Sequence, residues 1–319
     1  MADASLPKAT PAAKPKSAFA RLWDSDFGYS FRHSPVALTS AFVTVFLVLA
    51  AVFAPWIAPY DPFNPATLNL MNGFSPPMQP NAFTGETFWL GTDDQGRDVF
   101  STILYGLRIS LFVGFAAVLF AMILGVTLGL IAGYVGGWIE TIIMRVADVQ
   151  LTFPAILVAM LIFGIAKGIT PIEYRDQMAI WVLILAIGLS DWVQFARVVR
   201  GATLVEKNKE YVQAARVIGI PPVLIMLRHV LPNVMGPVLV IATIHLAIAI
   251  ITEATLSFLG VGVPPTSPSL GTLIRVGNDF LFSGEWWITI FPGAALAILV
   301  LAVNLLGDWL RDALNPKLR

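Results

Sequence analysis

The chain has 319 residues, of which 57% are hydrophobic and 13% are charged, and its 20 basic residues balance 20 acidic ones. Soluble domains usually carry about 25% charged residues, so this composition and a mean hydropathy of +0.77 predict an integral membrane protein. The zero net charge removes bulk basicity as an argument for nucleic-acid binding, and the absence of cysteine excludes disulfide scaffolds and thiolate chemistry.

Six runs with almost no charged residues are long enough to cross hydrocarbon, which takes about 20 helical residues. The predicted spans are 36–57, 109–134, 149–166, 177–196, 229–260 and 286–307. They predict an all-α integral membrane protein with six transmembrane helices. Its parts are an N-terminal tail (1–35), a first helix (36–58), an outer segment (59–105), a five-helix core (106–310) and a C-terminal tail (311–319). The composition of the opening stretch, rich in Ala, Pro and Lys, is typical of a disordered tail.

The basic residues predict which way the chain crosses the membrane. Six spans place both termini on one side, and 15 of the 20 basic residues then lie on that side. The five on the other side are Arg97, Arg108, Lys167, Arg175 and Arg275. Because basic residues concentrate in cytoplasmic loops, both termini are expected in the cytoplasm and residues 59–105 outside the cell.

The outer segment contains a charged cluster of three acids and one base: Asp93, Asp94, Arg97 and Asp98. The Glu that closes a calcium loop is missing at the right distance, so calcium binding is not expected. The charges are predicted to cap a short interfacial helix and to pair with one another. Contact with another protein outside the cell is the alternative.

Two sets of residues inside the predicted spans are candidates for function. Gly125, Gly129 and Gly133 lie on one helix face, which predicts a close helix contact that either transmits motion or is static packing. Ionisable residues inside a membrane are functional candidates by default, and here these are Asp191, His245 and Glu253. Glu253 faces either a translocation path or a partner, or else it is a hydrogen-bonded interface residue. The position of Asp191 near the inner end of the fourth span favours packing or interface hydrogen bonding.

The inner loop between the fourth and fifth predicted spans, residues 201–232, carries the most information. Apolar positions at spacings of three and four predict a short amphipathic helix: Val212, Ala215 and Gly219. Gly219 can end that helix in the left-handed conformation, and Pro222 suits the start of a second helix that re-enters the membrane near Pro232. This elbow either inserts into a groove of a partner protein or lies in the lipid interface.

The same loop resembles the EAA loop of ABC-transporter permeases, whose pattern is Glu-Ala-Ala, three residues, Gly, nine residues, Ile, one residue, Leu-Pro. The spacing here fits throughout, with Gln213 in place of the Glu and His229 in place of the Ile. The resemblance implies that the elbow is a coupling helix seated in a cleft of a cytoplasmic ATPase. The residues implied in coupling are Glu210, Tyr211, Gln213, Ala214, Ala215, Gly219, Leu231 and Pro232.

Four further segments are similar to the DppC/OppC type of the peptide, opine and nickel permeases: 90–111, 132–138, 255–262 and 307–316. This resemblance implies a MetI-like bundle in the bacterial inner membrane that imports dipeptides or oligopeptides by alternating access, with opines or nickel as alternatives. The implied partners are a second homologous permease, two ATPases that bind ATP and Mg, an extracytoplasmic binding protein and membrane lipid. The implied docking residues for the binding protein are those of the charged outer cluster.

The chain itself is not expected to bind ATP or to be an enzyme. It has no Gly-x4-Gly-Lys-Ser/Thr phosphate loop and no recognisable catalytic set or metal site, and no nucleic-acid partner is expected. A stand-alone secondary carrier is the competing function. It would need its own ion-coupling groups and usually repeated halves, and the elbow has no second copy.

Overall fold

A computed structural model describes residues 26–64 and 68–314, in which every regular element is a helix and the only other pairings are two isolated β-bridges. The helices that build the bundle are α2 (Asp26–His33), α3 (Pro35–Val52), α4 (Ala54–Ile57), α5 (Val99–Val135), α6 (Gly137–Leu151), α7 (Ala155–Ile169), α8 (Arg175–Glu206), α9 (Glu210–Val217), α10 (Pro222–Ile225), α11 (Leu231–Phe258), α12 (Leu270–Asn278) and α13 (Trp287–Leu314). Short 3-10 turns are η1 (Leu70–Asn72), η2 (Ile172–Tyr174) and η4 (Leu281–Ser283), and η3 (Met226–Val230) is a π-helix.

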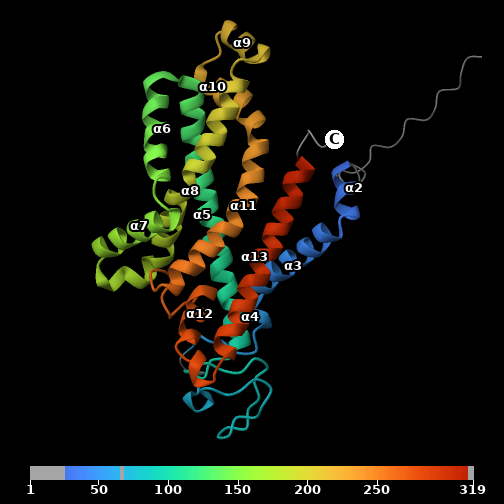
Figure 1. Cartoon of the computed structure of the whole chain (residues 1–319), viewed down its shortest axis with the longest axis vertical. Coiled ribbons are helices and arrows are strands. Elements are labelled where there is room, and N and C mark those ends of the chain that lie inside the picture. The colour runs from blue at the N-terminus through green and yellow to red at the C-terminus, as the bar shows by residue number, and fades with distance from the viewer. Residues whose placement is uncertain (1–25, 65–67, 315–319) are drawn as a thin grey trace, which may run out of the picture.

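Within these described ranges, five helical segments are long and apolar enough to cross a membrane, and the bent pair α6–α7 makes a sixth if it counts as one span. The predicted all-α fold with six spans is therefore confirmed. Figure 1 shows an elongated bundle with α9 at one end and the segment between α4 and α5 at the other. Helix α8 packs against α5, α7 and α11, while α13 packs against α3, α11 and α12.

Several predicted boundaries are wrong because charged residues do not mark helix ends. Helix α5 begins at Val99 rather than Ile109, since the Asp98 side chain accepts a hydrogen bond from the Ser101 amide and caps the helix there. The last residues of the predicted outer segment, 99–105, are therefore helical. Asp98 thus caps a long helix of the bundle, not a short interfacial one.

The third predicted span, 149–166, is also not a single helix. Helices α6 and α7 meet at a bend of 98° around residues 152–154. Pro154 has no amide proton and disfavours helical geometry at the residue before it, so α6 ends at Leu151 and α7 starts anew at Ala155. Helix α7 consequently runs crosswise to the long axis of the bundle (Figure 1).

Two further corrections concern the inner end of the bundle. Helix α8 extends to Glu206, so Asp191 lies near its middle and not near its inner end. The predicted second helix of the elbow and the fifth span are not separate helices, because α10, η3 and α11 form one continuous helical segment from Pro222 to Phe258. Pro232 cannot donate a backbone hydrogen bond, and the preceding turn widens so that the Leu231 amide donates to the Met226 carbonyl.

The tails are only partly described. Residues 1–25 and 315–319 of the two predicted tails lie outside the described residues. Within the remainder, α2 forms inside the predicted N-terminal tail, and α13 continues past residue 310 to Leu314. Helix therefore extends further into both predicted tails than the uncharged runs indicate.

Candidate functional site: the elbow and its supports

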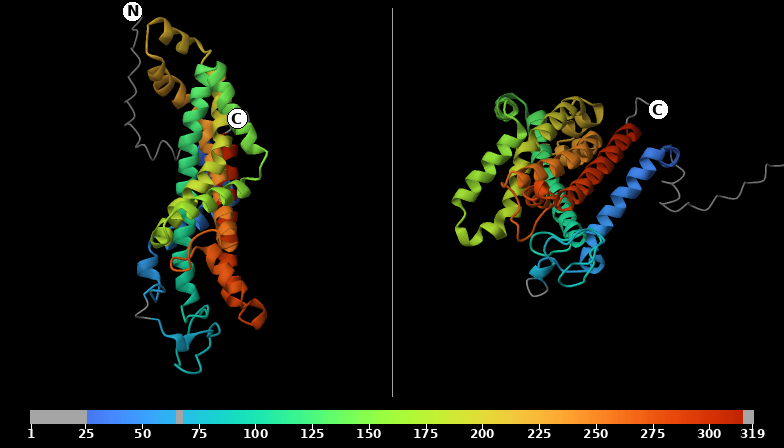
Figure 2. Two further views of the ribbon diagram at one scale, coloured as in Figure 1. Left: turned by 90° about the vertical axis from the view of Figure 1, so that its left-hand side faces the viewer. Right: turned by 60° about the horizontal axis from the view of Figure 1, so that its bottom comes forward.

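We define the elbow as residues 207–230, which join the end of α8 to the start of α11. Seen from the side, the elbow projects beyond the ends of the other helices (Figure 2). Its first helix, α9, ends in a Schellman motif, in which the Ile220 amide donates to the Ala215 carbonyl and the Gly219 amide donates to the Arg216 carbonyl. Gly219 has φ +85°, so the predicted left-handed position is confirmed.

One side of the elbow packs into the core. Val212, Ala215, Ile225 and Val230 are buried and belong to the main hydrophobic cluster of the bundle. Burial of these four apolar side chains holds the two short helices against the ends of the spans, because removing each side chain from water contributes about 1–3 kcal/mol of stability. The elbow is therefore a packed part of the fold.

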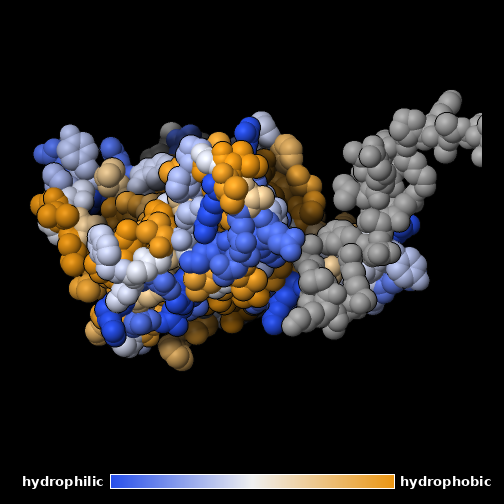
Figure 3. Space-filling view, turned by 90° about the horizontal axis from the view of Figure 1, so that it is seen from above, coloured by the Kyte–Doolittle hydropathy of each residue, from blue (hydrophilic) through white to orange (hydrophobic). Residues whose placement is uncertain are grey.

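The other side of the elbow is apolar but uncovered. Val217, Ile218 and Val223 are exposed by 88%, 77% and 60% at the turn between α9 and α10. Figure 3, seen from this end, shows hydrophobic side chains beside hydrophilic ones. We call these three residues the apolar tip. An uncovered apolar group on a rigid projection is typical of a surface that another protein covers.

Polar contacts tie the elbow to both helices that carry it. The Tyr211 hydroxyl donates to the Glu206 carboxylate at the end of α8, and the Asn233 amide nitrogen of α11 donates to the Tyr211 hydroxyl at 3.1 Å. Burial and the hydrogen bond to Glu206 raise the pKa of Tyr211 to about 12, so the hydroxyl keeps its proton at neutral pH. Lys209 adds an ion pair to Glu206 at 2.8 Å.

The elbow is also fixed to the end of α5. The Lys207 ammonium donates to the Gly133 carbonyl at 2.7 Å, and the Arg216 guanidinium lies 5.0 Å from the centre of the Tyr134 ring. Below the elbow, α8 is joined to α6 by ion pairs of Arg200 with Glu140 and of Arg197 with Asp148. Helices α5, α6 and α8 and the elbow are thus linked at this end.

The residues implied in coupling differ in how far they are exposed. Glu210, Gln213, Ala214 and Pro232 are exposed and Leu231 is partly buried, whereas Ala215 is buried under the helix. Gln213, which stands where the EAA pattern has Glu, donates to the Asn208 carbonyl at 3.0 Å. The side-chain amide of Gln213 therefore hydrogen-bonds to the backbone just before its own helix, α9.

The three glycines of α5 that were predicted to make a close helix contact lie against α8, and we call this contact the seam. A methyl group on Gly125, Gly129 or Gly133 would lie 2.5, 2.4 or 2.7 Å from the nearest atoms of α8. Ordinary contacts are 3.4 Å or more, so α5 and α8 approach more closely than any side chain permits.

Glu253 is completely buried among this chain's own residues. Its carboxylate accepts hydrogen bonds from the Ser110 and Ser257 hydroxyls, each at 2.8 Å, and Ser269 also interacts with it. Three helices meet there, since Ser110 is on α5, Ser257 on α11 and Ser269 at the start of α12. The sequence left two interpretations of Glu253 open. The observed geometry is that of a hydrogen-bonded internal contact and not of a side chain on an open path.

The other two ionisable candidates lie side by side in the core. His245 Nδ1 is 3.8 Å from Asp191 Oδ2, which is too long for a hydrogen bond, and both side chains are nearly buried. They come from α11 and α8, the two helices that the elbow joins. Nothing in their spacing along the sequence indicated that they meet.

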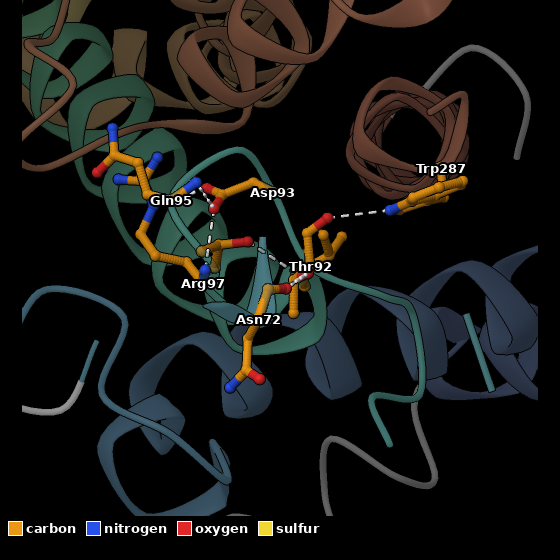
Figure 4. A network of polar contacts seen from close by, with 8 residues as sticks. Asn72, Thr92, Asp93, Gln95, Arg97 and Trp287 are labelled. Atoms are coloured by element: carbon orange, nitrogen blue, oxygen red, sulfur yellow. Dashed lines mark hydrogen bonds and ion pairs between the residues drawn. The ribbon is translucent and has the colours of Figure 1, made fainter. Parts of the chain in front are cut away.

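The charged outer cluster is used inside the chain (Figure 4). Asp93 pairs with Arg97 at 2.6 Å and accepts hydrogen bonds from the Gln95 and Arg97 amides, so the predicted internal pairing is confirmed. Burial raises the pKa of Asp93, and the contacts with Arg97 oppose that rise. Asp93, Arg97 and Asp98 are buried in this conformation and Asp94 is partly exposed, so a docking role for the cluster stays a prediction.

The same segment is fastened to α13. The Trp287 indole donates to the Thr92 carbonyl at 3.0 Å, and Thr92 in turn donates to the Asn72 carbonyl (Figure 4). Several large apolar side chains of the segment are exposed, among them Met78, Phe83 and Trp89. The sequence analysis did not single out Trp287. The only indication of its role was its position after a charged residue, at the start of the last span.

Sequence reasoning also missed the apolar tip and the supports Lys207, Arg216 and Asn233. The signal for the tip was present, since Val217, Ile218 and Val223 are apolar residues on both sides of the Gly-x-Pro-Pro turn. The supports had no such signal, because their partners are distant in sequence.

Two comparisons with families agree with this architecture. Residues 125–319, more than half of the chain, match the family described as "Binding-protein-dependent transport system inner membrane component". Residues 21–77 match the family described as "N-terminal TM domain of oligopeptide transport permease C".

Individual relatives cover nearly the whole chain. The oligopeptide transport system permease protein OppC of Bacillus subtilis (strain 168) is 36% identical over 299 residues, which are 93% of this chain and 90% of that protein. The glutathione transport system permease protein GsiD of Escherichia coli O6:K15:H31 (strain 536 / UPEC) is 39% identical over 297 residues, 92% of this chain and 90% of that protein.

Proposed function

We propose that this chain forms half of the path of an ATP-driven peptide importer. The chain belongs to the family of binding-protein-dependent transport system inner membrane components. As a transport permease component it supplies the membrane helices. The relatives' names, an oligopeptide permease and a glutathione permease, support short peptides as the substrate class. Nickel and opines are the alternatives that the family resemblance leaves.

The partners in this proposal are those of such an importer. A second homologous permease completes the path, two cytoplasmic ATPases bind ATP and Mg, and a binding protein delivers the peptide from outside. The 15-to-five bias of basic residues supports cytoplasmic termini, which places the elbow on the ATPase side.

The elbow is the observation that carries the proposal. It presents the apolar tip outside the predicted spans and is fixed through Tyr211 and Lys207 to α8, α11 and α5. A partner that covers the tip and moves would shift these helices with it. ATP binding would bring the two ATPases together and open the bundle outward, and hydrolysis would reset it. Each ligand shifts this balance only by its different affinity for the two states.

A matched pair of glycine variants tests the coupling role. Neither Gly219 nor Gly201 has an atom within 4 Å of an added methyl group, but only Gly219 has a positive φ. Gly219→Ala should strain the elbow by about 1–2 kcal/mol and Gly219→Val by more, whereas Gly201→Ala in α8 should not. The measurements are ATPase co-purification and ATP-dependent peptide uptake in vesicles.

The expected result is loss of uptake, of ATPase recruitment or of both in the Gly219 variants alone. Normal uptake and normal ATPase yield in Gly219→Val would contradict the coupling role. Uptake by the purified chain without any ATPase would instead support a secondary carrier, with Asp191, His245 and Glu253 as the groups to test.

A further inference from the structure

A basic cavity lies at the end of the bundle opposite the elbow. It measures about 210 Å³ and is enclosed by the turn between α7 and α8, the chain after α11, and α12. Three cationic side chains line it: Lys167 from the last turn of α7, Arg175 from the start of α8 and Arg275 from α12. They are three of the five basic residues that the sequence places on the outer side.

The charges in this cavity are not neutralised by the protein. In residues 26–64 and 68–314, none of the three cations forms an ion pair, and the one acidic residue of the lining is Asp176. The Arg175 Nε donates to the Thr170 carbonyl at 3.2 Å, which holds this guanidinium at the helix turn. By contrast, Arg97 in the outer segment is fully paired with Asp93. A concave site with an excess of two positive charges attracts an anion.

The position of Arg275 depends on a glycine. Gly260 follows the end of α11 and has φ +79°, and a methyl group there would lie 2.8 Å from the Arg275 Nη1. The guanidinium therefore rests directly on the backbone at the end of α11. This contact brings a charge from α12 to the side of the cavity formed by the Gly260–Val263 turn.

Two of the candidate membrane-spanning segments end beside the cavity. The spanning segment that contains α8 begins at Ile172, and the one that contains α11 ends at Phe258, so both spans end beside the cavity. Part of its wall is apolar, including Phe163 and Val182. Helix α7 exposes a row of large apolar side chains that leads to Lys167, formed by Leu161, Ile165 and Ile169.

We propose that this cavity binds the phosphate group of an anionic phospholipid in the leaflet at this end of the bundle. Basic pockets between transmembrane helices suit lipid headgroups, and fork-shaped guanidinium groups suit phosphate oxygens. The acyl chains would cross the exposed apolar row of α7 and contact its side chains. A bound lipid would join the crosswise α7–α8 turn to the end of α11 and to α12. This role is separate from coupling to an ATPase.

The test measures lipid binding to the purified, delipidated transporter by native mass spectrometry, with phosphatidylglycerol and phosphatidylcholine as the two probes. The wild-type protein should bind one phosphatidylglycerol more tightly than phosphatidylcholine, and added salt should weaken this preference. Removing one charge near a membrane surface costs about fivefold in affinity, so Arg175→Gln and Arg275→Gln should each weaken binding by about that factor. Arg275→Lys keeps the charge and should retain most of the binding.

Arg108→Gln is the matched control. Arg108 is also a basic residue on the outer side, but it lines a different, apolar groove between α3 and α5, so its loss should leave phosphatidylglycerol binding unchanged. Inorganic phosphate distinguishes the sources of the anion. If phosphate alone protects the protein against heat as well as the lipid does, the site takes free phosphate and the lipid proposal is wrong.

Two other binding results would overturn the proposal, and so would a competition result with the transported peptide. One is equal binding of both lipids by the wild-type protein at low and high salt. The other is an Arg175→Gln/Arg275→Gln double variant that assembles normally and binds phosphatidylglycerol as the wild type does. Loss of the phosphatidylglycerol preference when the transported peptide is added would show that a peptide carboxylate occupies the cavity instead.

Discussion

A single methyl group at Gly129 should separate α5 from α8. A Cβ at this position would lie 2.4 Å from the Ala196 carbonyl oxygen and 2.9 Å from the Val199 Cβ. An ordinary contact begins at 3.4 Å, so the helices would have to move apart by about 1 Å along the seam. Overpacking of this kind costs about 1–3 kcal/mol. Alanine raises helix propensity by about 1 kcal/mol, which offsets part of this cost.

The assay compares the thermal unfolding of Gly129→Ala with that of two control variants in the same detergent. Gly164→Ala in α7 and Gly236→Ala in α11 also replace helical glycines, but nothing lies within 4 Å of the added methyl group. The controls gain propensity without a clash, so they should be as stable as the wild type or more so. Gly129→Ala should unfold several degrees below them, since about 1 kcal/mol shifts the Tm of a large domain by about 2–4 °C.

The same variant separates the two readings of the seam. If the seam is static packing, Gly129→Ala lowers stability but the folded complexes couple ATP hydrolysis to uptake as the wild type does. If the seam moves during transport, uptake per ATP hydrolysed falls as well. Equal stability of Gly129→Ala and Gly236→Ala would refute the close contact between α5 and α8.

Three further outcomes follow from buried polar contacts. Glu253→Leu should lower the stability of the purified chain by about 3 kcal/mol in thermal unfolding, because the buried hydroxyl protons of Ser110 and Ser257 lose their acceptor, whereas Glu253→Gln should lose less. Tyr211→Phe should cost about 1 kcal/mol and make the elbow easier to cleave by a protease, because Glu206 loses a partly buried donor and keeps only Lys209. Trp287→Phe removes the donor to the Thr92 carbonyl, and hydrogen exchange of the outer segment should become faster while the spans stay protected.

The sequence predicted those features that depend on neighbouring residues. The spans follow from uncharged runs, and the end of α9 follows from Gly219, because only local backbone geometry decides it. The start of α5 is an exception among local features: Arg108 bounds the uncharged run, but the helix continues past it to the cap at Asp98. Hydrophobicity locates the part of a helix that contacts lipid, whereas capping locates its end.

Features that depend on distant residues could not be predicted. His245 and Asp191 were both singled out as intramembrane ionisable residues, yet their proximity follows only from the packing of α11 on α8. The basic cavity likewise joins charges from α7, α8 and α12 that the sequence counts only as outer residues. A residue type indicates that a contact is needed, and the fold alone decides with which partner.

The elbow and the seam are parts of one mechanical unit. Lys207, at the point where α8 becomes the elbow, donates to the carbonyl of Gly133, which is also the last glycine of the α5–α8 seam. Arg216 of α9 lies over the ring of Tyr134, the next residue of α5. In the proposed coupling, a load on the apolar tip would act on α5 and α8 together through these contacts. It would reach α11 as well, since Asn233 of α11 donates to the Tyr211 hydroxyl of the elbow.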